Sequence, residues 1–64
     1  MIDVYDGVWI RNTGEMPQFS KVDIVLSEDE ENYPGVPIIR YGQDPKEWDW
    51  TKHGVHITHY RSVI

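Results

Sequence analysis

Three histidines recur at every third position near the end of the chain, at His53, His56 and His59. Imidazole is a common metal ligand and the usual general base near neutral pH, so this spacing first suggests metal binding or acid–base catalysis. A helix would place the rings on one face, whereas strand alternation points His56 and His59 to opposite faces. Gly54 and the β-branched residues after it favour a strand. We therefore expect structural histidines and no metal site.

Acidic residues close to His53 in the sequence could imitate an acid–base cluster; they are Asp44, Glu47 and Asp49. Nearness in sequence does not supply the geometry that proton transfer needs. The chain also has no phosphate-binding glycine loop, no nucleophile elbow and no His-Glu-x-x-His motif. We expect no enzyme activity and no cofactor. One alternative stays open, a histidine–carboxylate metal site or a hydrolase built at a subunit interface.

The strands that must position these side chains are short. Apolar and polar residues alternate over residues 22–26, which predicts a half-buried strand. A second strand is predicted over residues 36–41, with apolar residues on both faces, as in a central strand or an interface. A proline near the start of this strand indicates that its beginning is unpaired or lies at an edge of the sheet. The last strand is expected over residues 55–63, where strict alternation puts Ile57 and Tyr60 on opposite faces.

The expected fold is small and mainly β (or α+β), a single domain over residues 1–64. It is a three- to four-stranded antiparallel meander with at most one short helical turn. Residues 1–5 could form a short strand or a frayed end, followed by a turn at Asp6-Gly7. Asp44 can cap the single helical turn, with Pro45 at its first position.

Large side chains must stabilise this domain, because it has no cysteine for disulfides and is close to the smallest size that one core can hold together. The three tryptophans are expected to fill the space over one face of the sheet. The residues expected to hold the fold are Trp9, Val22, Ile24, Ile38, Trp48, Ile57 and Tyr60. The burial of Trp50 and of His59 stays open.

Acidic charge is concentrated in the first half of the chain. Residues 1–31 carry eight acidic and two basic side chains, the rest carry three and four, and the net charge is −5. The acidity peaks over residues 28–31, a stretch expected to be a loop too polar to pack. Such a surface repels phosphates and attracts basic partners. The simpler interpretation is a solvated loop that keeps the protein in solution.

The order WI…MPQ…VDIVL…IIRYG…WDW…ITHYRSVI resembles short phage and prophage domains of unknown function. Those domains begin with Trp-Ile, have a proline before a V-x-V strand, and finish on Ile-Thr-His-Trp or on a hydrophobic-x-x-Tyr-Arg-Val ending. The matching residues here are Trp9, Ile10, Pro17, Val22, Ile24, Trp48, Ile57, Thr58, His59, Tyr60, Arg61 and Val63. The chain departs from the Trp-Met-Pro-Leu-Pro type of ending. The resemblance implies a small β-rich protein encoded by a phage or prophage, and it brings no catalytic residues.

Small size, acidity and this resemblance together favour a phage-type accessory protein that binds a host protein with a basic surface and inhibits or redirects it. DNA mimicry is a special case, in which carboxylates replace phosphates. The residues expected to bind the partner are Glu28, Asp29, Glu30, Glu31, Tyr33 and Trp50. The alternative is a structural module that assembles into a homo-oligomer.

The remaining expectations concern the compartment. No run of about 18 apolar residues is present, and the first residues lack the features of a signal peptide. We expect a cytoplasmic protein, in the host cytoplasm if it is phage-encoded. Neither a membrane nor direct nucleic-acid contact is expected.

Overall fold

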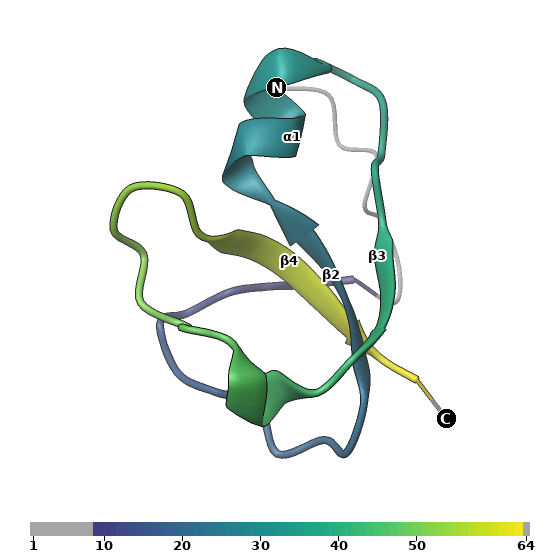
Figure 1. Ribbon diagram of the computed structural model, residues 1–64, viewed down its shortest axis with the longest axis vertical. Coiled ribbons are helices and arrows are strands. Elements are labelled where there is room, and N and C mark those ends of the chain that lie inside the picture. Colours follow the sequence, from purple (N-terminus) through teal and green to yellow (C-terminus); the bar gives the residue numbers. More distant parts are fainter. Residues whose placement is uncertain (1–8, 64) are drawn as a thin grey trace.

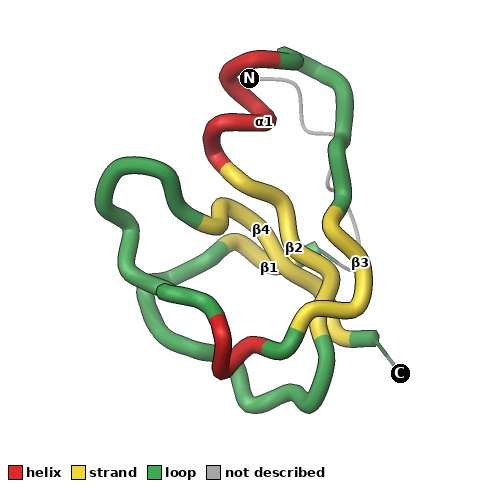
Figure 2. The backbone as a smooth tube through the Cα atoms, viewed as in Figure 1, coloured by secondary structure: helices red, strands yellow, loops and turns green. Residues whose placement is uncertain are grey.

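Four antiparallel strands form one sheet in a computed structural model that describes residues 9–63. They are β1 (Ile10–Arg11), β2 (Val22–Leu26), β3 (Arg40–Gln43) and β4 (Ile57–Ser62), in the order β1-β4-β2-β3 (Figure 1). The predicted small mainly-β or α+β class is confirmed. The predicted meander is wrong, because β4 lies between β1 and β2 and pairs with both (Figure 2). The strand and turn expected within residues 1–7 lie outside the described residues.

All five residues of β2 are buried, which makes this strand the centre of the packing. The core cluster consists of Val22, Ile24, Leu26, Trp50 and Ile57, with Trp48 and Tyr60 packed against it. Trp50 is only 5 % exposed, so its burial is settled. Its ring meets Tyr60 edge-on at 5.4 Å, and its indole Nε1 donates a hydrogen bond to Pro45 O at 2.7 Å. The core roles predicted for Val22, Ile24, Trp48, Ile57 and Tyr60 are confirmed.

A β-bulge interrupts β4. The register against β2 shifts after Val25, where Thr58 becomes an extra residue between Ile57 and His59. A bulge displaces the two-residue alternation of side chains by one position. Ile57 and Tyr60 consequently both face the core cluster, and the prediction that they lie on opposite faces is wrong.

The face of the sheet opposite the core carries a partly buried ion pair. Arg61 Nε lies 2.8 Å from Asp23 Oδ2, and the guanidinium carbon of Arg61 lies 4.6 Å from the centre of the Trp9 ring. A guanidinium over an indole face is a favourable cation–π contact. Trp9 therefore packs on the opposite side of the sheet from the other two tryptophans, which corrects the expectation that all three fill one face.

The acidic run forms a helix, α1 (Ser27–Asn32), and the loop predicted there is wrong. The physical reason is that two of its acids find partners on the sheet. Asp29 is 8 % exposed, and its Oδ2 lies 3.3 Å from Arg40 Nη2. Acidic residues in the first turn also suit the positive end of the helix dipole.

β3 is shorter than predicted and begins at Arg40. Residues 36–39 belong to no strand, and Ile38 is half-buried outside the core cluster, so its predicted core role is wrong. β3 is the last strand of the sheet order, which excludes the central position considered for it. A proline in the preceding segment, Pro37, cannot donate to a strand ladder, in agreement with the expected unpaired start.

The second helical element is a single 3-10 turn, η1 (Pro45–Glu47). Asp44 Oδ1 accepts a hydrogen bond from Lys46 N at 3.0 Å, and Pro45 occupies the first position, so the predicted capped turn is confirmed. Over residues 9–63, no helix has the length and apolar character required to cross a membrane.

Candidate binding site beside the β4 bulge

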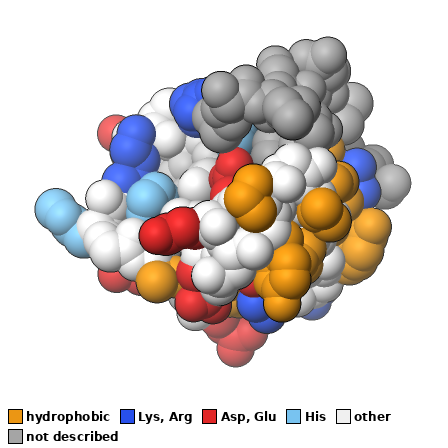
Figure 3. Space-filling view, turned by 90° about the horizontal axis from the view of Figure 1, so that it is seen from above, with side chains coloured by type: hydrophobic (Ala, Val, Ile, Leu, Met, Phe, Trp, Pro, Cys, Tyr) orange, Lys and Arg blue, Asp and Glu red, His pale blue; other side chains and the backbone are white. Residues whose placement is uncertain are grey.

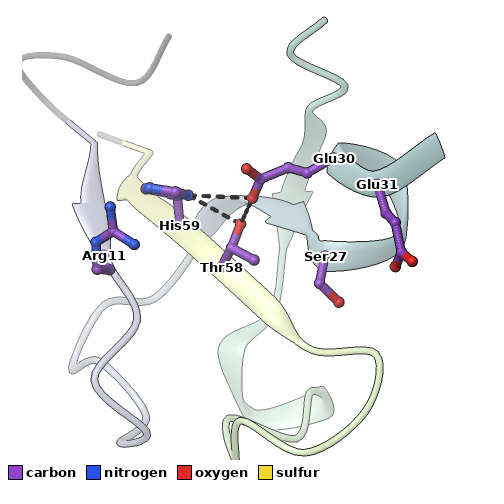
Figure 4. Close-up of a pocket in the computed structure, with 6 residues that line it drawn as sticks. All are labelled: Arg11, Ser27, Glu30, Glu31, Thr58 and His59. Atoms are coloured by element: carbon purple, nitrogen blue, oxygen red, sulfur yellow. Dashed lines mark hydrogen bonds and ion pairs between the residues drawn. The ribbon is translucent and has the colours of Figure 1, made fainter. Parts of the chain in front are cut away.

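The bulge turns Thr58 and His59 to the same side of β4, toward α1 (Figure 4). Thr58 Oγ1 donates a hydrogen bond to Glu30 Oε1. His59 Nδ1 lies 3.0 Å from Thr58 Oγ1 and 3.6 Å from Glu30 Oε1. His59 is 6 % exposed, which settles its burial. These three side chains tie α1 to the sheet.

Backbone and hydroxyl contacts of Ser27 hold the start of α1. Ser27 N donates to His56 O at 2.8 Å, and Ser27 Oγ accepts from His56 N at 3.0 Å. A helix of six residues is not stable by itself in water, so α1 depends on these contacts. Glu28 and Glu31 remain exposed on the helix.

A hollow of about 310 Å³ lies between α1, β1 and β4. We call it the acidic hollow; it is lined by Arg11, Ser27, Glu30, Glu31, Thr58 and His59. Arg11 comes from β1 on one side of Thr58, and Glu31 comes from α1 on the other (Figure 4). Among residues 9–63, neither the Arg11 guanidinium nor the Glu31 carboxylate makes an ion pair or a side-chain hydrogen bond. Both charges are therefore available to a ligand.

A second hollow, of about 80 Å³, adjoins the first. We call it the basic hollow; its lining residues are Arg11, Asn12, Lys52, His56, Ile57 and Thr58. Lys52 Nζ lies 3.5 Å from Asn12 O, which is longer than a normal hydrogen bond. His56 Nδ1 lies 2.7 Å from Gly54 O, so this nitrogen carries the proton and Nε2 is left for other contacts.

Asn12 forms the floor of the basic hollow and is 2 % exposed. Its Nδ2 donates to Ile57 O at 2.7 Å and to Trp50 O at 3.1 Å. Its Oδ1 accepts from Gly14 N at 2.8 Å. Asn12 thereby joins the segment after β1 to the loop before β4 and fixes the shape of the hollow.

The residue types of Glu30, Thr58 and His59 could activate a hydroxyl nucleophile. The single hydroxyl proton of Thr58 already has two acceptors, Glu30 Oε1 and Val25 O at 3.3 Å. These contacts hold α1 against the sheet. Arg11, Glu31 and Lys52 also face the hollows, and their charged groups take no part in holding α1 against the sheet.

The acids near His53 do not assemble an acid–base cluster. Asp44 caps η1, and Asp49 Oδ1 accepts hydrogen bonds from Thr51 N at 3.0 Å and Thr51 Oγ1 at 2.8 Å. The backbone hydrogen bond and then the hydroxyl hydrogen bond lower the pKa of the Asp49 carboxyl, with a smaller contribution from His53. Within residues 9–63, no group of three or more histidine or carboxylate side chains is placed to hold a metal ion.

The residues predicted to bind a partner divide into three sets. Glu28, Glu31 and Tyr33 are exposed, and Tyr33 is 54 % exposed. Asp29 and Glu30 point into the protein and bind Arg40 and the Thr58–His59 pair. Trp50 lies in the core and is not on the surface that Glu28, Glu31 and Tyr33 share. Sequence reasoning missed Arg11, Ser27, Lys52 and Thr58, which come from β1, from α1, from the loop before β4 and from β4.

No protein-family model, curated protein or solved structure matches this chain significantly.

Proposed function

We propose that this chain is a small protein-binding module of the phage accessory type, which captures a basic surface of a host protein and inhibits or redirects that protein. The supporting observation is the division of roles within α1. Asp29 and Glu30 bind the sheet, whereas Glu28 and Glu31 face solvent. A helix fixed in this way presents its outward acids at a lower cost in backbone ordering on binding.

An exposed apolar patch adjoins α1. Tyr33 and Val36 are each 54 % exposed, and a turn with a 3.1 Å hydrogen bond from Val36 N to Tyr33 O joins them. Seen from above, hydrophobic side chains gather beside acidic ones on this end of the molecule (Figure 3). Aromatic anchors contribute binding energy at protein interfaces, and carboxylates steer the approach of a basic partner. This combination supports a protein partner.

The surface of α1 does not favour DNA mimicry. Only two of the four consecutive acids, Glu28 and Glu31, are exposed on α1. Duplex DNA carries one charge per about 1.7 Å of its axis, in two continuous rows. Two outward carboxylates beside an aromatic ring resemble a protein interface more closely.

Affinity capture from bacterial lysate tests the proposal. The parent chain is compared with Glu28→Lys/Tyr33→Ala and with the matched double variant Glu47→Lys/Tyr41→Ala, which makes the same chemical changes at exposed positions outside α1. We expect the parent and the matched variant to recover the same basic protein and the α1 variant to lose it. Recovery of no specific protein, or equal recovery by all three chains, would contradict the proposal.

Self-association is a second candidate, favoured by the position of β3. This strand ends the sheet order, and Tyr41 within it is 64 % exposed. Gln43 Nε2 donates to Tyr41 O at 2.7 Å and so covers one acceptor of this edge. Sedimentation equilibrium that shows only a monomer at high protein concentration would exclude this candidate.

A further inference from the structure

We infer that the acidic and basic hollows form one bipolar groove, into which a segment of the partner polypeptide places a Lys or Arg side chain and an Asp or Glu side chain. This inference rests on the proposed function and specifies what the partner must carry. Four observations support it: the continuity of the hollows, their opposite charges, their sizes and the unpaired groups at their rims.

Continuity follows from the shared lining. Arg11 and Thr58 belong to both hollows. Arg11 lies on β1 and pairs in register with His59, the neighbour of Thr58 on β4. The hollows therefore meet along the boundary between β1 and β4, and one extended segment can enter both.

The two ends carry opposite charge. The acidic hollow adds Glu30 and Glu31 to the shared residues, whereas the charged residue that the basic hollow adds is Lys52. A ligand with positive charge alone would meet repulsion from Arg11 and Lys52. A ligand with negative charge alone would meet repulsion from the two glutamates. Opposite charges on one ligand remove both penalties.

The volumes match side chains of different size. The acidic hollow, at about 310 Å³, is large enough for a Lys or Arg side chain with its aliphatic stem. The basic hollow is smaller, at about 80 Å³, and has room for a carboxylate group. Each hollow has its own lining on either side of Arg11 and Thr58. Two side chains of a peptide can reach across this boundary more readily than the amino and carboxylate groups of a free amino acid, which share one α-carbon.

The fourth observation is that charged groups at the rims of the hollows lack ion-pair partners within the described part of the chain. Glu31 and Arg11 make no ion pair among residues 9–63, and Lys52 has one long contact with a backbone oxygen. Exposed ion pairs contribute about 0.2–1 kcal/mol each, so a short peptide should bind weakly and the energy should be shared between the two ends. Weak binding of this kind is measurable by nuclear magnetic resonance.

The experiment titrates the isotope-labelled protein with blocked tripeptides at low ionic strength, where charge contacts are least screened. The probes are acetyl-Lys-Ala-Glu-amide, acetyl-Lys-Ala-Lys-amide, acetyl-Glu-Ala-Glu-amide and free lysine. We expect the Lys/Glu peptide to give saturable shifts at Arg11, Glu31 and Lys52 and to bind several-fold more tightly than the like-charged peptides. Equal affinity for the three peptides, or no saturable shift, overturns the inference. Tighter binding of free lysine than of the Lys/Glu peptide also overturns it, because the ligand would then be a single amino acid.

Matched variants locate the two contacts. Glu31→Gln and Lys52→Gln each remove one end of the groove, and each should weaken the Lys/Glu peptide about two- to fivefold. Glu47→Gln and Lys46→Gln neutralise exposed residues outside both hollows and should leave the affinity unchanged. Equal weakening by all four variants would indicate a general charge effect and overturn the inference.

The groove and the proposed function can fail separately. A host-protein affinity that falls in Glu28→Lys/Tyr33→Ala but is unchanged in both Glu31→Gln and Lys52→Gln would overturn the groove and leave the protein-binding proposal in place. Saturable binding of the Lys/Glu peptide without any captured host protein would support the groove and contradict the host-protein proposal.

Discussion

The hydroxyl of Thr58 and the imidazole of His59 lie 3.0 Å apart on one side of β4, although the two residues are consecutive in a strand. The bulge at Thr58 makes this arrangement possible. The same hydroxyl contacts Glu30 of α1 and, at 3.3 Å, Val25 O of β2. Three elements of the chain therefore meet at one oxygen atom.

Thr58→Val should loosen α1. Valine keeps the shape of threonine but removes the hydroxyl, which leaves the partly buried Glu30 carboxylate without its donor. We expect a loss of about 1–3 kcal/mol in the free energy of unfolding, and faster amide hydrogen exchange over residues 27–32. Thr13→Val, at an exposed position, is the control. Indistinguishable urea unfolding curves for the two variants would show that the hydroxyl is dispensable.

Asn12 should tolerate neither alanine nor aspartate. Asn12→Ala leaves the buried carbonyls of Trp50 and Ile57 without a donor, and we expect a loss of about 1–3 kcal/mol. Asn12→Asp keeps the volume but directs a carboxylate at both oxygens. Burial and this repulsion should raise the pKa of the new carboxyl above about 3.9, its unfolded value.

The free energy of unfolding of Asn12→Asp should decrease as the pH rises. Because the folded-state pKa at Asn12→Asp is raised, the variant is least impaired below the unfolded pKa and loses stability as pH rises through the folded pKa. Urea unfolding across this range measures the effect. Asn32→Asp, at an exposed position, should show no comparable loss on raising the pH. A flat difference between Asn12→Asp and Asn12→Ala would refute the expected repulsion.

The two C-terminal tryptophans should differ in their importance. Trp50→Ala removes a core side chain and its hydrogen bond to Pro45, so we expect a loss of about 3–5 kcal/mol. This is comparable to the whole stability of so small a domain, and the variant should be unfolded. Trp48→Ala, at a half-buried position, should keep a cooperative thermal transition with a lower midpoint. Circular dichroism melts distinguish the two, and the reverse order would mean that the assigned core is wrong.

Asp49 should titrate below its ordinary pKa of 3.8, because Thr51 donates two hydrogen bonds to its carboxylate. A lowered folded-state pKa contributes stability above the unfolded pKa, and this contribution is lost as pH falls through the folded value. Thr51→Ala removes the hydroxyl but keeps the backbone N–H, so the pKa should rise part of the way back. A carbon-detected pH titration measures it, with Thr13→Ala as the control. No change in Thr51→Ala would show that the backbone bond acts alone.

The sequence predicted the elements whose signals are local. β2 has a two-residue alternation, and the three-residue turn η1 begins at Pro45 directly after its cap, Asp44. Both were placed correctly because backbone propensity and tertiary packing favour the same structure there. The core residues Val22 and Ile24 of β2 followed from the same alternation, whereas alternation placed Ile57 and Tyr60 of β4 on opposite faces.

The sequence could not predict α1 or the bulge, because both depend on distant partners. Asp29 binds Arg40 across 11 positions, and Glu30 binds Thr58 across 28. From local sequence alone, an acidic stretch of six residues predicts a solvated loop. The candidate groove shares this origin, since Arg11 and Lys52 meet only after β4 has paired with β1. No local pattern marks such a site.

The place of β4 between β1 and β2 has a consequence for the order in which the protein folds. Among the described strands, β1 has no sheet partner except β4, and β4 is the last strand along the chain. While the ribosome is still making residues 57–62, β1 has nothing to pair with and the core lacks Ile57. The sheet can therefore be completed only after residues 57–62 have left the ribosome. Pairing over such sequence separations is slow compared with local folding, so we expect one late cooperative step without a folded subdomain before it.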